Sequence, residues 1–260
     1  MDAEQIARRL DLAWRTRTPI PPISESDGVS AIAEAYAIQS HWTDARIASG
    51  DKVVGRKIGL TSQAIQQQLG VSEPDYGTLW KSNFYPATGG HTRIPAADFL
   101  QPRIEGEVAF LIGERLTGPD VTAEQLLASV EAYALGVEIV DSRIADWKIK
   151  LVDTIADNAS FGGFTLGPWD RNVSAVDLST LFMKISHNGA PAAEGPASAV
   201  MGHPALSAAW LANKLCEFNV ALEPGDILIS GGITKMLPVK GGDSFVFSLT
   251  GQPELTVSFF

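Results

Sequence analysis

The sequence has a single cysteine, few cationic residues and no long hydrophobic run. Cys216 is alone in a chain of 260 residues, which excludes an internal disulfide and a metal site built from several thiolates. Lys and Arg number 20 against 30 Asp and Glu, so the net charge of -10 gives no attraction to nucleic acid or to anionic lipid. No run of about 18 apolar residues is present, and the N-terminus MDAEQIARRLDLAW lacks the pattern of a signal peptide. We expect a cytoplasmic protein without nucleic-acid or membrane partners.

Apolar residues spaced four apart predict helices in the first 50 residues. Ile6, Leu10 and Trp14 fall on one face of a helix over residues 2–17. The proline-rich segment TPIPPIS ends that helix, and a second helix is predicted over residues 30–50, where a glycine stops it. The N-terminal fifth of the chain is therefore predicted to be helical.

After residue 51, short β-branched runs separated by Gly and Pro predict strands: KVVGRKIGLT, IEGEVAFLIG, VEIVDSRI, GDILISGGIT, DSFVFSLTG and ELTVSFF. Two helices interrupt them, one from the capping-box residue Thr122 to about Leu135, the other from Gly-His-Pro at 202–204 to about Phe218. Cys216 falls on the apolar side of the second helix, which indicates a core thiol rather than a nucleophile. The elements do not alternate as βαβ units, so the predicted fold class is a mixed, strand-rich α+β body.

Acidic residues interrupt two of the predicted strands. Glu105 and Glu107 stand two positions apart, so in a strand both side chains point to the same face. Together with Glu138 they would offer a hard divalent cation such as Mg²⁺ an all-oxygen site. The alternative is that the first two lie on a solvent-exposed edge strand, and that Glu138 pairs with Arg143 or Arg103.

Several other polar residues are candidates with ordinary structural explanations. Lys57 lies between apolar residues, where burial would disfavour the ammonium form and permit proton exchange near neutral pH; a strand lysine reaching solvent is the alternative. Asp75 in PDYG fits a turn, DTIADNAS fits caps and turns as well as an active site, and the glycines of SGGIT let backbone N–H groups approach a carboxylate. No G-K-[ST] follows those glycines, and His187 and His203 lack ligand spacing, so neither a P-loop nor a zinc site is predicted.

In their order along the chain these segments resemble one family. The segments are VVGRKIGLTSQAIQQQLGVSEPDYGTL, QPRIEGEVAFLIG, VEIVDSRIADWKIKLVDTIADNAS, LGPWD, MGHP and GDILISGGIT. They are similar to the 2-hydroxypenta-2,4-dienoate (2-keto-4-pentenoate) hydratases and the 4-oxalocrotonate decarboxylases of the fumarylacetoacetate-hydrolase-like superfamily, over nearly the whole chain. The resemblance implies that superfamily's strand-rich α+β fold over residues 52–260, after a helical region at 1–51. It also implies a homo-oligomer, often of pentameric symmetry, that can associate with a pathway enzyme.

The resemblance also implies roles for individual residues. Three acids match the family's ligands for Mg²⁺ or Mn²⁺, which would bind the carboxylate and 2-oxo oxygen of a short oxo acid: Glu105, Glu107 and Glu138. Lys57 matches the family's proton-carrying lysine. Ser160 and Thr234 match positions near the substrate carboxylate.

Asp75 favours hydration over decarboxylation within this family. The hydratases carry an aspartate at this position, where it would orient or deprotonate the water added at C4, whereas the decarboxylases have an apolar residue. GGIT at 231–234 instead resembles the decarboxylase form of its loop. The predicted function is a hydratase that converts 2-hydroxypenta-2,4-dienoate or a substituted analogue to a 4-hydroxy-2-oxo acid, in meta-cleavage degradation of aromatic compounds. The alternatives are a 4-oxalocrotonate decarboxylase and a catalytically silent subunit of a hydratase–decarboxylase complex.

Overall fold

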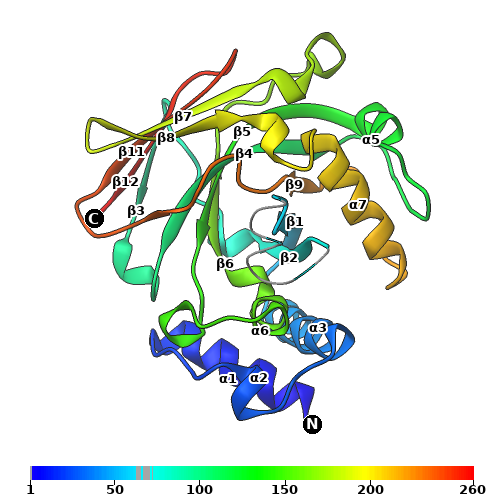
Figure 1. Ribbon diagram of the computed structural model, residues 1–260, viewed down its shortest axis with the longest axis vertical. Helices are drawn as coiled ribbons and strands as arrows, with labels where there is room; N and C mark the ends of the chain where they lie inside the picture. The colour runs from blue at the N-terminus through cyan, green and yellow to red at the C-terminus, as the bar shows by residue number, and fades with distance from the viewer. Residues whose placement is uncertain (1, 63–65, 67–70, 72) are drawn as a thin grey trace.

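The computed structural model describes residues 2–62, 66, 71 and 73–260. The chain begins with a group of helices at one end of the molecule (Figure 1). They are α1 (Ala3–Thr16), α2 (Ile23–Ser26) and α3 (Ile32–Ala48). The side chain of Asp2 caps α1 by accepting a hydrogen bond from the backbone N–H of Gln5 at 3.1 Å. Ile6 and Leu10 are buried, so the helices predicted from the four-residue spacing are confirmed.

The described residues form two sheets, and the larger one holds most of the predicted strands. Its strand order is β2-β1-β9-β4-β5-β6, with β10 paired to one end of β4. The β1–β9 pairing is parallel and the others are antiparallel. The strands are β1 (Val53–Gly59), β2 (Asp75–Trp80), β4 (Arg103–Ile112), β5 (Val130–Val140), β6 (Phe161–Leu166), β9 (Ile227–Ile229) and β10 (Leu237–Pro238).

The second sheet has the order β3-β12-β11-β7-β8 and packs against the face of β4 that carries Gly106. The contact is close at Gly106, because a Cβ there would lie 2.8 Å from Cε of Met183 and 3.0 Å from the ring of Phe247, so Met183 would have to shift. The strands are β3 (His91–Ile94), β7 (Phe182–His187), β8 (Ala190–Pro196), β11 (Ser244–Leu249) and β12 (Leu255–Phe259). One face of β4 therefore meets the second sheet, which leaves the glutamate-bearing face directed elsewhere.

Three local predictions are corrected by the structure. The capping box at Thr122 forms, but helix α5 (Ala123–Ser129) ends well before Leu135, because the following residues pair with β4 as strand β5. Asp75 is the first residue of β2 rather than part of a turn, because it pairs with Gly59 of β1. Cys216, expected in the core, is only partly buried because it is the last residue of α7 (Pro204–Cys216).

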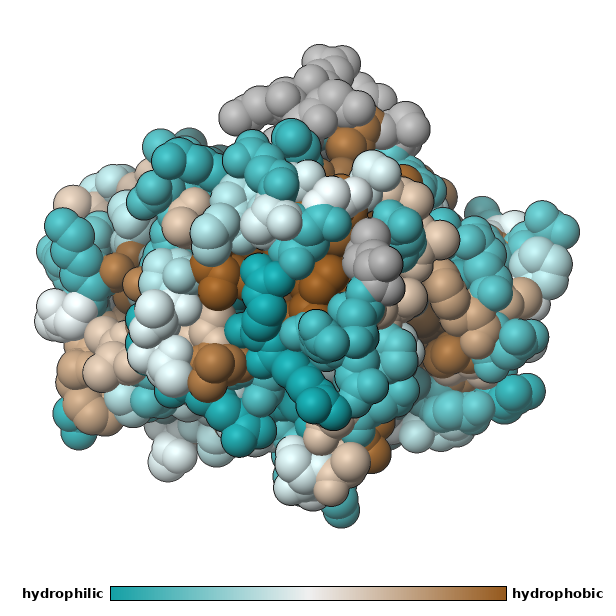
Figure 2. Space-filling model, turned by 90° about the horizontal axis from the view of Figure 1, so that it is seen from below, coloured by the Kyte–Doolittle hydropathy of each residue, from teal (hydrophilic) through white to brown (hydrophobic). Residues whose placement is uncertain are grey.

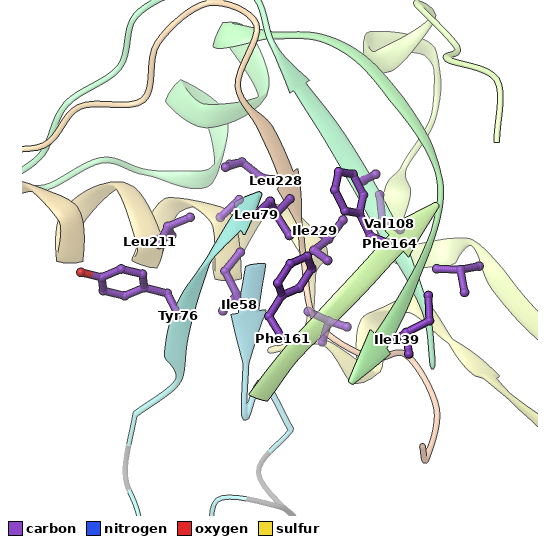
Figure 3. Close-up of a cluster of buried hydrophobic side chains, with 14 of the residues drawn as sticks. Ile58, Tyr76, Leu79, Val108, Ile139, Phe161, Phe164, Leu211, Leu228 and Ile229 are labelled. Atoms are coloured by element: carbon purple, nitrogen blue, oxygen red, sulfur yellow. The ribbon is translucent and has the colours of Figure 1, made fainter. Parts of the chain in front are cut away.

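Helices hold the larger sheet in place. Short α6 (Leu151–Ala156) packs against α3, and Gln39 of α3 donates hydrogen bonds of 2.8 Å to the carbonyl oxygens of Tyr76 and Ile155, which ties the N-terminal helices to β2 and α6. The sheet's side chains pack with Leu211 of α7 in a buried apolar cluster (Figure 3). His203 caps α7 by accepting a hydrogen bond from the N–H of Ala205 at 2.9 Å, which confirms the predicted helix start.

The surface and the helices give two further observations. Polar residues cover most of the face seen in Figure 2, with apolar residues scattered between them. Within the part of the chain that the structure describes, no helix is both long and apolar enough to cross a membrane.

Candidate active site

The register between β4 and β5 brings three glutamates together. Glu105 lies directly opposite Glu138, and Glu107 lies one pleat further along the same face of β4. One carboxylate oxygen of each lies within 4.8 Å of the others, and the Glu107 and Glu138 side chains are fully buried. The alternative of an exposed edge strand is wrong, because β4 lies between β9 and β5. The alternative arginine partners of Glu138 are also wrong: Arg143 pairs with an aspartate, and Arg103 stacks on a tryptophan ring.

The glutamate cluster has carboxylate oxygens that the protein leaves without hydrogen bonds. Oε2 of Glu138 and Oε1 of Glu107 are buried and accept no hydrogen bond from the described residues, and Oε1 of Glu138 has only an ion pair with Lys57. Burial and then the charge of Glu138 raise the pKa of Glu105 to about 8, and the same causes raise that of Glu107 well above its usual range. Three clustered carboxylates that have lost their protons offer the oxygen ligands that a hard divalent cation prefers, so the three residues form a candidate metal site.

Two consecutive glycines after β9 let the backbone approach this cluster. The N–H of Gly231 donates a hydrogen bond of 2.6 Å to Oε2 of Glu107, which confirms the predicted approach of backbone N–H groups to a carboxylate. Gly231 has φ +103°, and a Cβ there would lie 2.3 Å from Oγ1 of Thr61. A Cβ at Gly232 would lie 2.2 Å from Oε2 of Glu105. Larger residues at either position would therefore displace groups of the site.

Lys57 of β1 points at the glutamate cluster from a buried position. Its Nζ lies 3.1 Å from Oε1 of Glu138 and donates a hydrogen bond of 3.0 Å to the carbonyl oxygen of Ala159. Burial lowers the pKa of Lys57, but the surrounding carboxylates, Glu138 and Asp75 first, outweigh burial and raise it above its usual value. The predicted proton exchange near neutral pH therefore does not follow for the metal-free chain, because the acids stabilise the ammonium form.

Asp75 shares a small cavity with Lys57 and Glu105. The cavity has a volume of about 80 Å³, and Asp75 enters it from the first residue of β2. Its Oδ2 accepts a weak hydrogen bond of 3.4 Å from Oγ1 of Thr154, which also borders the cavity. Burial raises the pKa of Asp75, against the opposing charge of Lys57. The site thus places a carboxyl group of raised proton affinity in the same cavity as Glu105 and Lys57.

Residues 158–160 form an unusual turn beside Lys57. Asn158, Ala159 and Ser160 all have left-handed φ values, 54°, 50° and 53°, a conformation that costs non-glycine residues free energy. The side chain of Asn158 holds the turn on β2 by accepting a hydrogen bond of 2.7 Å from the N–H of Thr78 and donating one of 2.9 Å to its carbonyl oxygen. This conformation directs the carbonyl oxygen of Ala159 to Lys57.

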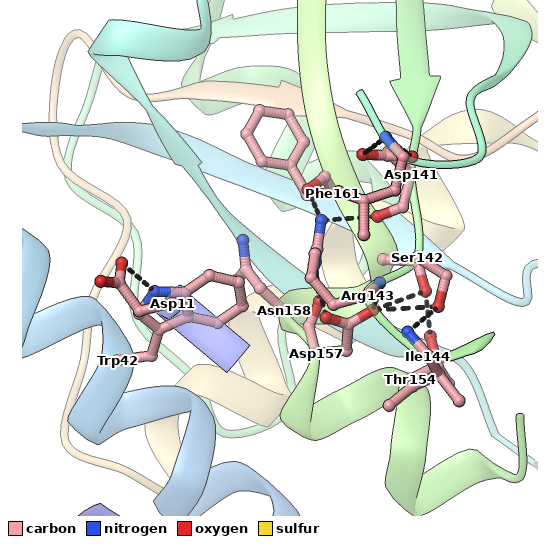
Figure 4. Close-up of polar contacts among 12 residues, drawn as sticks. Asp11, Trp42, Asp141, Ser142, Arg143, Ile144, Thr154, Asp157, Asn158 and Phe161 are labelled. Atoms are coloured by element: carbon pink, nitrogen blue, oxygen red, sulfur yellow. Dashed lines mark hydrogen bonds and ion pairs between the residues drawn. The ribbon is translucent and has the colours of Figure 1, made fainter. Parts of the chain in front are cut away.

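The buried Arg143 binds residues on both sides of the turn, Asp157 and Phe161 (Figure 4). The fully buried Arg143 donates through Nε to Oδ1 of Asp157 at 2.5 Å, and through Nη1 to the carbonyl oxygens of Asp141 and Phe161 at 2.5 and 2.7 Å. Its Nη2 also donates to the carbonyl oxygen of Asp157. Burial raises the pKa of Asp157 to about 6, although Arg143 opposes the shift. Asp157 in DTIADNAS, a segment that fits caps and turns, is therefore held by Arg143 next to the turn at residues 158–160.

Comparison with known proteins identifies the family of this chain. A family model described as the C-terminal region of fumarylacetoacetate hydrolase matches residues 52–259. The chain belongs to the fumarylacetoacetate hydrolase family. It is 41% identical over 256 residues to a 2-hydroxyhexa-2,4-dienoate hydratase of Comamonas testosteroni, covering 98% of this chain and 97% of that protein. It is 39% identical over 256 residues to a 2-keto-4-pentenoate hydratase of Paraburkholderia xenovorans, covering 98% and 94%.

A solved structure of the same family has nearly the same fold. The 4-oxalocrotonate decarboxylase from Pseudomonas putida G7, complexed with magnesium and adipate, superposes with a TM-score of 0.95 at 30% identity, covering 99% of this chain and 97% of that one. The predicted family and the predicted α+β fold with N-terminal helices are confirmed. That relative was solved with magnesium, the kind of cation for which the glutamate cluster of this chain is a candidate site.

The remaining predicted residues of this fumarylacetoacetate hydrolase family member also border the cavity. Ser160 and Thr234 both line it, and Oγ of Ser160 lies 3.4 Å from Oγ1 of Thr154. Their roles toward a substrate stay predictions. Sequence reasoning missed Thr154 and Trp147, which line the same cavity. Both stand in the quoted DSRIADWKIKLVDTIADNAS segment, but local pattern alone gave no reason to select them.

Proposed function

We propose that the protein is a divalent-metal-dependent hydratase that adds water to 2-hydroxypenta-2,4-dienoate or a substituted analogue, giving a 4-hydroxy-2-oxo acid in meta-cleavage degradation of aromatic compounds. The observation that carries the proposal is the buried Asp75, which shares one cavity with Lys57 and with Glu105 of the glutamate cluster. The full-length similarity to two dienoate hydratases supports it. We propose residues 52–260 as the catalytic region, residues 1–51 as its helical support, and a cytoplasmic homo-oligomer as the working form.

The glutamate cluster would hold the cofactor. Glu105, Glu107 and Glu138 are proposed as ligands of Mg²⁺ or Mn²⁺, because among the described residues Lys57 is the only cation that pairs with their carboxylates. When bound, the cation supplies charge that offsets the glutamates and the anionic oxygens of a 2-oxo acid. Ser160 and Thr234 are proposed to contact the substrate carboxylate from the cavity wall.

Lys57 is proposed to carry the proton in the first step. Ketonisation removes the proton of the C2 hydroxyl and adds one at C5, which leaves an α,β-unsaturated ketone with its double bond between C3 and C4. The hydrogen bond to Ala159 and the ion pair with Glu138 hold Nζ at the edge of the cavity, where a substrate bound at the glutamates would lie. Starting as the ammonium form, Lys57 would donate its proton to C5 as a general acid and regain one from the C2 hydroxyl.

Asp75 is proposed to act in the second step. Water adds its oxygen to C4 and C3 gains a proton, so a base that orients or deprotonates the water is required. The raised pKa of Asp75 increases its affinity for that proton, and Thr154 lies close enough to keep its carboxyl group turned toward the cavity.

The test is a spectrophotometric assay of metal-free protein with freshly generated 2-hydroxypenta-2,4-dienoate, before and after addition of Mg²⁺, with the product identified by mass. Metal-dependent loss of the dienol with a gain of one water is expected. Asp75→Asn is expected to abolish most of that gain, whereas Asp120→Asn, which alters an exposed acid outside the cavity, is expected to be neutral. CO₂ release from 4-oxalocrotonate without any hydration would instead establish a decarboxylase. Inactivity on both substrates despite Mg²⁺ binding would favour a silent supporting subunit.

A further inference from the structure

The cavity has one acidic and one apolar end. Val140 stands two residues beyond Glu138 on β5, so its side chain faces the same way one pleat, about 7 Å, further along. Trp147, Ile149 and Met236 line the cavity together with Val140. Among the described residues that line it, Lys57 is the only cation, and it is already paired with Glu138. A negatively charged group at the apolar end would therefore have no counter-charge within the cavity.

A cation lies behind this apolar wall. Arg103 stands two residues before Glu105 on β4 and directly opposite Val140, so its side chain leaves the same face of the sheet. Its guanidinium stacks on the ring of Trp147, 4.3 Å from the ring centre, and forms no ion pair within the described part of the chain. Trp147 lines the cavity and Arg103 does not, so the indole ring separates the guanidinium from the cavity.

The position of Trp147 is fixed by more than this stacking. Its Nε1 donates a hydrogen bond of 3.2 Å to the carbonyl oxygen of Gln101. Asp146 and Trp147 both adopt left-handed φ values, 58° and 56°, between the end of β5 and the start of α6. A bulky residue in this conformation is strained, and such strain persists where the surroundings determine the conformation. The ring is therefore held as a wall rather than as a freely turning side chain.

We propose that Trp147 determines the specificity of the site for substrates with an uncharged tail, by forming the wall at the far end and by screening Arg103 from a second carboxylate. The inference rests on the proposed function, in which the 2-oxo acid end lies at the glutamates. A C6 methyl group then packs on the apolar wall, whereas a C6 carboxylate loses its water there without gaining a partner. Removal of the ring exposes Arg103, which can pair with that carboxylate.

The test compares two substrates that differ only at C6: 2-hydroxyhexa-2,4-dienoate, and the corresponding dienedioate, which is the enol of 4-oxalocrotonate. The parent protein with Mg²⁺ is expected to prefer the methyl substrate by at least tenfold in kcat/KM. Trp147→Ala is expected to reduce that preference at least tenfold, and the double variant Trp147→Ala with Arg103→Gln is expected to remove the gain on the diacid. Lys148→Ala, which removes an exposed cation of the same loop that pairs with Asp146, is expected to leave the preference unchanged.

A binding measurement keeps the inference separate from the proposed function. Adipate ends in a second carboxylate and hexanoate in a methyl group, and neither reacts. The rise in melting temperature that each gives the Mg²⁺-loaded protein therefore compares the two C6 groups by binding alone. Hexanoate is expected to stabilise the parent more, and adipate to stabilise Trp147→Ala more, with Trp147→Leu as the second variant if the alanine form does not fold. Equal stabilisation in the parent, or an adipate gain that survives Arg103→Gln, overturns the role of Trp147. Inactivity on every dienoate with the predicted binding pattern overturns only the hydratase function.

Discussion

Replacement of Arg143 by methionine tests how much the buried ion pair between Arg143 and Asp157 contributes to the free energy of unfolding. The substitution keeps an unbranched apolar side chain but removes every donor of the guanidinium. Asp157 loses the bond from Nε, and the carbonyl oxygens of Asp141, Asp157 and Phe161 lose their bonds from the two terminal nitrogens. Among the described residues, Asp157 then keeps the bonds from the hydroxyl groups of Ser142 and Ser160 and from the backbone N–H of residue 143.

The magnitude follows from complete burial of both partners. Removal of one member of a buried ion pair costs about 3–5 kcal/mol, because the other charge is left uncompensated. Each carbonyl oxygen that stays buried without a donor adds about 1 kcal/mol. We therefore expect Arg143→Met to lower the free energy of unfolding by at least about 3 kcal/mol at pH 7. The double variant Arg143→Met with Asp157→Asn is expected to recover part of this loss, because no buried charge then remains.

The pH dependence gives the prediction a second readout. The pKa of Asp157 is about 6 in the folded chain and 3.8 in the absence of structure, so the folded state binds more protons than the unfolded state between these values and stability falls as pH rises through them. Without Arg143 the folded pKa rises further, which extends this window upward. The deficit of Arg143→Met is therefore expected to be smaller at pH 5 than at pH 8.

Equilibrium unfolding in urea, followed by tryptophan fluorescence at one protein concentration, measures both effects. With a slope of roughly 3 kcal/mol per molar urea, the midpoint is expected to fall by about 1 M or more. Arg171→Met is the control, since Arg171 forms an exposed ion pair with Glu131 whose loss costs under about 1 kcal/mol. A deficit no larger than that of the control, or one that is the same at pH 5 and pH 8, would show that Arg143 does not compensate a buried charge on Asp157.

Three other predictions address the site and its support. Lys57→Met is expected to reduce kcat about 100- to 10,000-fold while Mg²⁺ still binds, as measured by turnover and calorimetry. Burial and Glu138 raise the pKa of Glu105 from 4.5 to about 8, so the metal-free protein is expected to lose stability as pH rises from 5 to 8. Mg²⁺ displaces the proton that Glu105 retains, so its affinity is expected to increase over the same range. Thermal unfolding with and without Mg²⁺ measures both trends, and a melting temperature that does not change with pH would contradict them. Gly106→Val is expected to cost about 1–3 kcal/mol in urea unfolding by collision with Met183, and Met183→Ala in the same chain should recover part of it.

The acidic face of β4 was accessible to sequence reasoning because alternation along a strand is a local property. Glu105 and Glu107 must share a face once the segment is a strand, whatever it pairs with. The helix over residues 3–16 followed from spacing in the same way. The error at residues 130–135 has the opposite cause: a capping box and an apolar run suit a helix locally, but the pairing of those residues with β4 favours a strand.

Segment order and local periodicity were enough to predict the family, the α+β class, and a set of acids and a lysine suited to a metal-dependent site. Three features required the folded chain: Glu138 lies opposite Glu105, Arg143 pairs with Asp157 rather than with a glutamate, and Arg103 stacks on the ring of Trp147. The physical reason is that strand register, ion pairing in the core and ring stacking are set by contacts between segments far apart in the chain. Each of them is chosen by the free energy of the whole packed molecule, which no single stretch of sequence contains.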